Sequence, residues 1–415
     1  MHTCKEYIVT LPINTLPPEV TQAADKPGHR ARQRPATDPF AEVDLDALAR
    51  DFDALRDELV ADIGEDDRIH LLKMQRWIRR LKIVGYATAW IAPNPITVLA
   101  LAQAKFSTWG MTAHHVLHKG YDRVEGLPKQ YRSDTFANGP WRRFCDWLDW
   151  MPPTGWHREH NILHHYRLGE ENKDPDLVED NLSWLRSLPV PIAARKLLLW
   201  VMASLWKPFY YAPACIIERE LEAERRRDPG AAQRKVSRRQ VYSPFSALGR
   251  QLWTESWLPV TAWNFIAVPL LFMPLGPWAV GSVFINQVLS EIATNLLSFM
   301  MIVPNHAGDD IYRFDTRVDC KGEFYLRQLT GSANMHTGAD LNDFAHGFLN
   351  YQIEHHLWPD LPMRKYQEAQ PRVKAIAAKY GLPYAQESVF KRVARTVDIA
   401  VGKTDMRRRC TERAT

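Results

Sequence analysis

Cysteine is scarce in this chain, and the few cysteines lie far apart. Five occur among 415 residues, an odd number, and no two of them form a C-x-x-C pair. A disulfide framework needs paired cysteines and a cysteine-rich zinc site needs closely spaced ones. We therefore expect neither, and the cysteine usage suits a reducing cytoplasm.

A large charge of one sign is also lacking. The formal net charge is +5 and the pI is about 8.8, which is only mildly basic beside the strong bias of nucleic-acid-binding domains. We therefore expect no nucleic-acid partner. Residues 1–20 contain no basic stretch followed by an apolar run, so no secretory signal is expected there. No internal repeat of the solenoid type is visible.

The N-terminal part of the chain changes character near residue 40. Prolines are frequent between residues 12 and 39 and large apolar residues are few, which predicts a disordered tail over residues 1–40. Apolar residues then recur at helical spacing up to Gly64, which predicts an amphipathic helical region over residues 41–80. The residues that carry this periodicity are Leu45, Leu48, Phe52, Leu55 and Leu59.

Two long apolar runs, 258–273 and 277–303, are separated by a short Pro-Leu-Gly stretch. Each is near the roughly 20 residues that cross a bilayer, so they predict a transmembrane hairpin. Glu291 in the second run is costly in lipid and should face protein. The run 197–217 is interrupted by Lys207, Pro208 and Pro213, so we expect it to lie in the membrane interface rather than to span. The apolar segments around Pro93 are short for two full spans.

Histidines gather in three clusters, at residues 114–118, 157–165 and 352–356. On a helix, residues four apart share a face, which would align His114 with His118 and His160 with His164. His165 lies about 100° further round than His164, so such an adjacent pair can reach two metal ions that share one site. The third cluster repeats the adjacent pair.

Seven histidines at these spacings exceed the four ligands of a structural zinc ion and the three of a catalytic one. Imidazole suits iron, copper, nickel and zinc alike, so ligand number, not ligand type, argues for two ions. Redox-active iron is the natural choice if the chemistry activates oxygen. Nearby carboxylates, namely Asp122, Asp174, Asp176 and Glu354, could hold the outer ring N–H groups of the ligands.

The three patterns H-x-x-x-H, H-x-x-x-H-H and Q-x-x-H-H resemble the histidine boxes of the membrane fatty acid desaturases. The flanking segments HNILHH…DPD and GFLNYQIEHHLWPDLP match as well. The resemblance covers roughly residues 80–395 and is closest to the branch whose third box begins with Gln. It implies an all-α integral membrane helical bundle with a cytoplasmic helical cap that carries a di-iron site.

The resemblance also implies site residues. The family's extra ligand between the boxes falls on His306 here. Weaker roles beside the ligands are expected for Gln352, Asn305, His157 and Asp176, and packing or outer roles for His115, His336 and His346. The expected metal ligands, which are also the expected catalytic residues, are His114, His118, His160, His164, His165, His306, His355 and His356.

Family members use O₂ and two electrons to place a double bond in an acyl chain. The resemblance therefore implies two iron ions and O₂ as requirements, and a long-chain acyl-CoA or membrane acyl lipid as the substrate. No His-Pro-Gly-Gly haem motif occurs in the sequence, so we expect a separate ferredoxin-type carrier with an NAD(P)H reductase. The expected location is a bacterial cytoplasmic membrane, with the active site on the cytoplasmic face.

Residues 81–395 are thus predicted to form the desaturase domain, followed by a basic C-terminal tail over residues 396–415. Two alternatives remain open. A related histidine-box membrane hydroxylase would insert oxygen instead of removing hydrogen. A zinc-bearing membrane protein would carry out no redox step at all. Metal analysis and the identity of the product separate the three.

Overall fold

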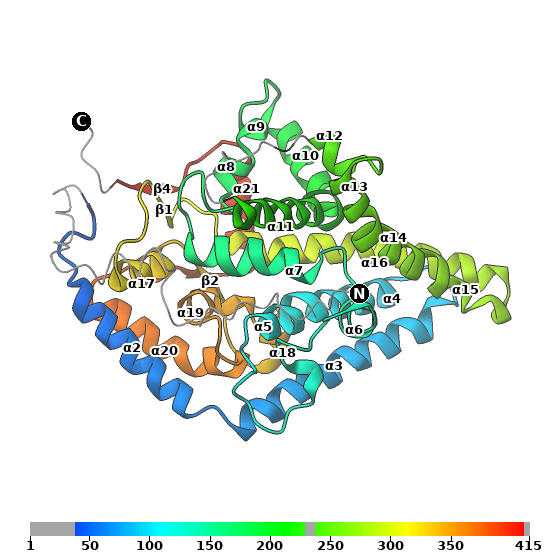
Figure 1. Ribbon diagram of the computed structural model, residues 1–415, viewed down its shortest axis with the longest axis horizontal. Coiled ribbons are helices and arrows are strands. Elements are labelled where there is room, and N and C mark those ends of the chain that lie inside the picture. Colours follow the sequence, from blue (N-terminus) through cyan, green and yellow to red (C-terminus); the bar gives the residue numbers. More distant parts are fainter. Residues whose placement is uncertain (1–37, 229–235, 237, 411–415) are drawn as a thin grey trace.

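The computed structural model describes residues 38–228, 236 and 238–410. Helices make up almost all of its regular structure (Figure 1), which confirms the helical part of the predicted fold class. Four short strands form two parallel two-stranded ladders that the all-α prediction omitted. Strands of two or three residues show no alternating apolar pattern, so nothing in the sequence indicated them.

The helices fall into three successive groups along the chain. Those before the second histidine cluster are α2 (Leu45–Ala61), α3 (Glu65–Ala89), α4 (Pro95–Phe106), α5 (His114–Leu117), α6 (Pro140–Asp146) and α7 (Pro153–Trp156). The middle group is α8 (Val178–Asn181), α9 (Ser183–Arg186), α10 (Ile192–Ser204), α11 (Ala212–Arg227), α12 (Arg238–Tyr242), α13 (Ala247–Leu252), α14 (Leu258–Thr261), α15 (Val268–Leu270) and α16 (Pro277–Ile302). The last group is α17 (Lys321–Thr330), α18 (Asp340–Ala345), α19 (Gln352–Leu357), α20 (Met363–Lys379) and α21 (Val389–Ala400).

Several helices are interrupted by π-helical turns. Such turns accommodate one extra residue in the hydrogen-bonding ladder and occur often at functional sites. Two of them carry or directly precede histidine clusters. The π-helical segments are η1 (Ser107–Ala113), η3 (His157–His164), η4 (Lys207–Tyr211), η5 (Trp253–Trp257) and η6 (Ala262–Ala267).

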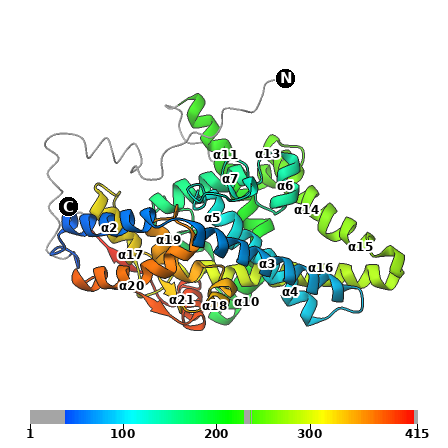
Figure 2. The same cartoon turned by 90° about the horizontal axis from the view of Figure 1, so that it is seen from below.

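The predicted amphipathic helix forms as α2. Asp44 caps its start by accepting a hydrogen bond from the backbone N–H of Ala47. The buried face packs on α17 and α20 (Figure 2), with the ring of Phe52 5.2 Å from that of Tyr325 and 6.0 Å from that of Trp358. Trp358 lies two residues after His356 of the third histidine cluster, so this helix supports the site from outside. Burying each large apolar side chain contributes about 1.5–3 kcal/mol.

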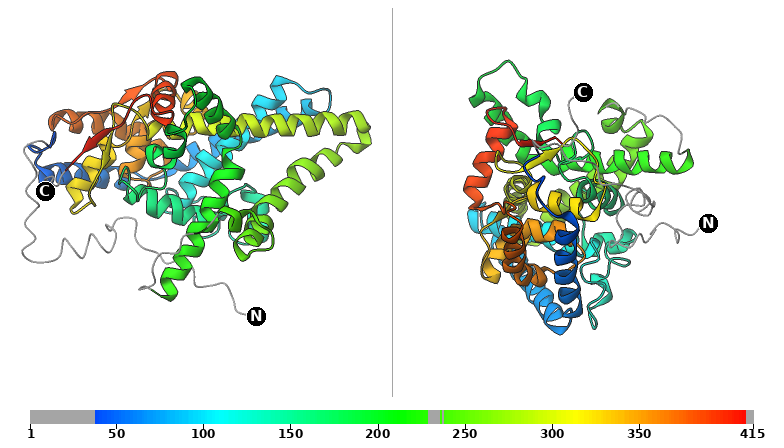
Figure 3. Two further views of the ribbon diagram at one scale, coloured as in Figure 1. Left: turned by 90° about the horizontal axis from the view of Figure 1, so that it is seen from above. Right: turned by 90° about the vertical axis from the view of Figure 1, so that its left-hand side faces the viewer.

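Two helices are long and apolar enough to cross a membrane, Ala247–Leu275 and Pro277–Asn305. They form a helical hairpin at the two predicted apolar runs, and α4 packs along α16 beside it (Figure 3); that the hairpin crosses a membrane stays a prediction. Glu291 faces protein as predicted: its carboxylate accepts from the indole N–H of Trp150 at 2.6 Å and from Lys105 Nζ at 3.1 Å. The run 197–217 is broken after Ser204 into α10, η4 and α11, and is not one of the two candidate spans.

Both ends of the described chain meet. The strand β1 (Tyr312–Phe314) pairs in parallel with β4 (Arg407–Arg409), and β2 (Asn334–Met335) pairs with β3 (Gln386–Glu387). Arg409 is fully buried and donates to Asp38 at 2.9 Å and to Glu323 at 2.7 Å. Residues 396–410, predicted as a basic tail, are therefore part of the fold, because Arg409 finds buried carboxylates. Residues 1–37 and 411–415 lie outside the described part.

Candidate metal centre

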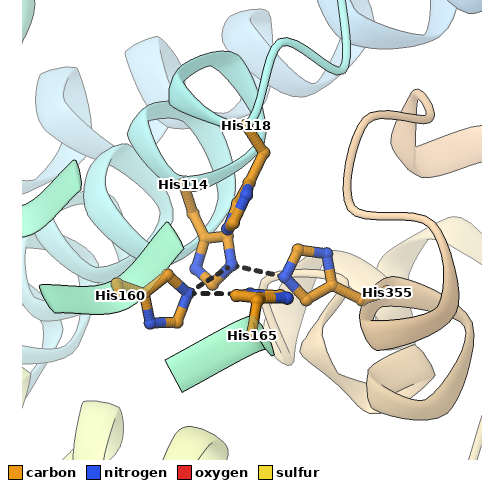
Figure 4. Close-up of side chains that lie close together, drawn as sticks. All are labelled: His114, His118, His160, His165 and His355. Atoms are coloured by element: carbon orange, nitrogen blue, oxygen red, sulfur yellow. Dashed lines mark hydrogen bonds between the residues drawn. The ribbon is translucent and has the colours of Figure 1, made fainter. Parts of the chain in front are cut away.

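Five histidines converge on one point in the interior (Figure 4). One ring nitrogen from each lies within 4.8 Å of those of the others, and all five side chains are buried. They come from α5 and its end, from η3 and its end, and from α19, segments that are far apart in the sequence. The members of this five-histidine group are His114, His118, His160, His165 and His355.

A second group lies beside the first. It consists of His164, His306 and His356, which are buried and also have ring nitrogens within 4.8 Å of one another. The adjacent residues of the second and third clusters divide between the groups: His165 and His355 join the first, and His164 and His356 join the second. The rings of His165 and His356 stack with centroids 4.2 Å apart, so the two groups are immediate neighbours. This is the geometry that the adjacent pairs predict.

The second cluster reaches this arrangement through a π-helix, not the α-helix expected. In η3 the hydrogen bonds run from i to i+5, so His160 and His165 come onto one side. Their Nε2 atoms lie 3.2 Å apart. The α-helical expectation aligned His160 with His164 instead. Those two rings still lie 5.3 Å apart, and each has a ring nitrogen within 4.8 Å of the other and of an Asp176 oxygen. Even so, His160 belongs to the first group and His164 to the second.

Hydrogen bonds to Nδ1 orient the rings of His164 and His356 in the second group and of His355 in the first. Nδ1 of His164 lies 2.8 Å from Asp174 Oδ1, and Nδ1 of His356 lies 3.0 Å from Gln328 Oε1. Both partners are acceptors, so each Nδ1 carries the proton and Nε2 keeps its lone pair. Nδ1 of His355 lies 3.2 Å from the hydroxyl of Tyr366.

The donor set fits metal ions. Burial, reinforced by the neighbouring imidazoles, lowers the pKa of His118, His160 and His356 well below the ordinary histidine value, which favours the neutral form that ligates. Burial also acts on His164, but Asp174 raises its pKa overall. Within the described residues, buried ring nitrogens including Nε2 of His118 and of His356 have no hydrogen-bond partner. A buried ring nitrogen without a hydrogen-bond partner destabilises the folded state unless a bound group, such as a metal ion, contacts it.

The residues expected beside the ligands fall into two classes. Gln352 Nε2 lies 3.0 Å from His306 Nε2, and Asn305 Nδ2 lies 3.3 Å from Gln352 Oε1. Asp176 has a carboxylate oxygen 3.7 Å from His164 Nδ1. These three thus lie at the site, whereas His157 contacts Asn161 at 3.0 Å.

Of the four carboxylates expected to hold ring N–H groups, Asp174 does so directly. Asp122 instead accepts from Ser133, and Glu354 accepts from Asn334 and Tyr384. Gln328 and Tyr366 perform that role for the third cluster, and sequence reasoning missed both. Gln328 lies in α17, but neither residue has a spacing in the sequence that marks it.

The remaining histidines of the boxes differ in placement. His115 is buried beside the first group, with its ring 5.4 Å from that of His355, but its Nδ1 lies 2.7 Å from the carbonyl oxygen of Met111. His346 binds the carbonyl of Asn342, and His336 is exposed. None of these three belongs to either histidine group.

A cavity of about 450 Å³ reaches the histidines from the surface. His114, His160 and His306 form its inner end, with the rings of Trp109 and Trp156 beside them. The rest of its wall is almost entirely apolar and comes from α8 to α12 and α16. The arrangement connects a mostly apolar cavity to members of both histidine groups.

Comparison with known proteins agrees with this geometry. A family model described as fatty acid desaturase matches residues 88–388. The NADPH-dependent stearoyl-CoA 9-desaturase of Mycobacterium tuberculosis is 25% identical over 380 residues, which cover 86% of this chain and 79% of that protein. The Delta(8)-fatty-acid desaturase of Euglena gracilis is 24% identical over 381 residues, covering 88% and 81%. No solved structure matches the chain significantly.

Proposed function

Because the chain belongs to the fatty acid desaturase family, we propose that it introduces a cis double bond into a long-chain acyl group by using O₂ and two electrons from a separate carrier. One observation carries the proposal: an apolar cavity ends at buried histidines of both metal-binding groups. A mid-chain CH₂–CH₂ unit offers no polar handle, so its reaction depends on being held beside the oxidising centre.

Two iron ions, one in each histidine group, would supply the activation of O₂ that no amino-acid side chain provides. The eight histidines His114, His118, His160, His164, His165, His306, His355 and His356 would hold them. Asp174, Gln328 and Tyr366 keep three of the rings oriented. The cavity wall would hold the acyl chain straight and exclude water from the reacting carbons.

The electron balance requires a donor. Reducing O₂ to two molecules of water takes four electrons and four protons. Breaking two C–H bonds of the acyl chain supplies two electrons and two protons, so two further electrons and two protons must come from outside. We propose a ferredoxin-type carrier with an NAD(P)H reductase. The protein would lie in a bacterial cytoplasmic membrane, with the histidine groups on the cytoplasmic side of its hairpin.

Reconstitution tests the proposal. Purified protein with iron, O₂, NAD(P)H, a ferredoxin and its reductase should convert a saturated acyl chain to a mono-unsaturated one, identified by gas chromatography–mass spectrometry. No oxygen from ¹⁸O₂ should enter the product, and omission of the carrier should stop turnover. Iron should be bound at about two ions per chain. A hydroxylated main product would show that the protein is a hydroxylase instead. Bound zinc in place of iron, with no uptake of O₂, would rule out both the desaturase and the hydroxylase reaction.

A further inference from the structure

We propose that the acyl chain reaches the histidines sideways from the lipid bilayer, through a mouth formed by Trp184, Val201, Leu205 and Phe209, and hence that the substrate is an acyl chain of a membrane lipid. This inference rests on the proposed function. The four residues line the cavity, and each is exposed although it is large and apolar, with Val201 and Phe209 at about half exposure (50% and 51%).

The mouth lies where the cap meets the candidate spans. The ring of Phe209 is 5.4 Å from that of Trp257, which belongs to the first candidate span. The indole N–H of Trp257 donates to the carbonyl of Pro208, and the hydroxyl of Tyr242 donates to that of Phe209. Clustered Trp and Tyr residues mark the level of a membrane–water interface.

Helix α10, which carries Val201 on the other side of the mouth, packs against the second candidate span. In this contact with α16, the ring of Trp200 lies 5.8 Å from that of Phe299. Outside the mouth, the outer face of α10 is also apolar, with Leu197 and Leu198 both exposed and neither of them in the cavity wall. An apolar helix face at this level is typical of a segment that lies in the interface. The mouth therefore opens toward acyl chains rather than toward water.

The residues that line the cavity also favour a membrane lipid as the source of the acyl chain. Among the described residues that line it, Asp176 is the only carboxylate or cationic side chain apart from the histidines, and no Lys or Arg is present. Recognition of the phosphates of a CoA group depends on such cations. An acyl chain that slides in from the bilayer leaves its polar head group at the interface and needs only apolar contact inside.

Photolabelling and turnover together test this route. The full-length protein in vesicles is given phosphatidylcholine with a diazirine at the middle of one saturated acyl chain. We expect labelling within residues 181–217. Val201→Arg and Leu205→Arg should each lower both this labelling and the desaturation of vesicle phosphatidylcholine roughly tenfold, because a cation at the mouth is costly beside lipid. Leu197→Arg is the matched control, on the same helix but outside the cavity wall, and should change both less than twofold.

The outcomes separate this inference from the proposed function. Desaturation of albumin-bound stearoyl-CoA without desaturation or labelling by vesicle lipid would overturn the lipid route and leave the desaturase reaction standing. Equal loss in Leu197→Arg and Val201→Arg would also overturn it, since the effect would then be on membrane attachment. Labelling at the mouth without any desaturation would support the route and contradict the proposed reaction.

Discussion

At the scale of single residues, the site depends on where each imidazole nitrogen points. Adjacent histidines such as His164 and His165 serve different groups, so a change at one should remove a ligand from one ion only. Outer partners decide which nitrogen faces inward. We therefore expect substitution of a metal ligand and substitution of a ligand's hydrogen-bond partner to have different effects on activity and on bound iron.

Loss of a ligand should abolish the reaction. We expect His165→Ala and His356→Ala each to lower turnover by at least about a thousandfold, because neither ion can be replaced by the remaining one. Bound iron, measured by mass spectrometry of the metal, should fall toward one ion per chain. His346→Ala, at a half-buried histidine outside both groups, is the control and should retain activity and iron. Full activity of His165→Ala would contradict the two-ion assignment.

Loss of an outer partner should weaken metal binding without abolishing it. Gln328→Ala removes the acceptor for Nδ1 of His356, and such changes typically lower metal affinity by about 10–100-fold. The measurement is iron retention against a chelator. Gln328→Glu restores an acceptor and should retain iron better than Gln328→Ala. If the two variants lost iron equally, the orienting role would be wrong.

At the scale of elements, the π-helical turn η4 directs Lys207 into the protein interior and leaves Phe209 exposed at the cavity mouth. Lys207 Nζ lies 2.6 Å from Asp149 Oδ2 and 4.6 Å from the ring centroid of Trp109. Lys207 is 1% exposed and Asp149 8%. Trp109 lines the cavity, so this buried ion pair holds one wall of the cavity in place.

Removing only one member of this ion pair should destabilise the fold. Lys207→Met leaves the Asp149 carboxylate buried without its cation, a change that typically costs about 3–5 kcal/mol. The apparent unfolding temperature in detergent should fall clearly. The double variant Lys207→Met/Asp149→Leu should recover most of the loss, because the Asp149 carboxylate is then no longer buried without a cation. A double variant no more stable than Lys207→Met would show that the pair's geometry, not its charge balance, stabilises η4.

At the scale of the whole molecule, exposed apolar side chains gather on the hairpin and on α10. Only a small share of the first candidate span is buried, 17% of its most apolar stretch. The cap is instead rich in ion pairs, such as Arg56 with Asp360 and Arg392 with Asp310. From this division we expect the histidines to lie just outside the bilayer.

The separation between an apolar hairpin and a charged cap predicts that the protein remains with the membrane fraction of a cell. Carbonate washing at high pH should leave the chain in the membrane pellet, because two apolar helices insert too strongly to be displaced with peripheral proteins. Immunoblots of pellet and supernatant measure this. The variant Leu270→Lys/Leu271→Lys, at exposed positions within the first span, should shift the chain toward the supernatant or lower its abundance. Release of the unaltered chain by carbonate would contradict the spanning hairpin.

The sequence by itself determined the features that depend on nearby residues. The spacing of Leu48 and Phe52 specified α2, two apolar runs specified the hairpin, and adjacent histidines specified side chains that diverge toward two groups. These are consequences of helical geometry and of the cost of exposing apolar surface, which act over one or two turns or over one continuous run.

Only the tertiary structure decided which distant segments meet. Gln328 and Tyr366 hold ring nitrogens of His356 and His355 because folding brings α17 and α20 against α19, and no spacing in the sequence records such a contact. The π-helical turn that pairs His160 with His165 was equally invisible, since an extra residue in the ladder is stabilised by surrounding contacts rather than by local preference. The cavity mouth likewise exists only where η4 meets Trp257.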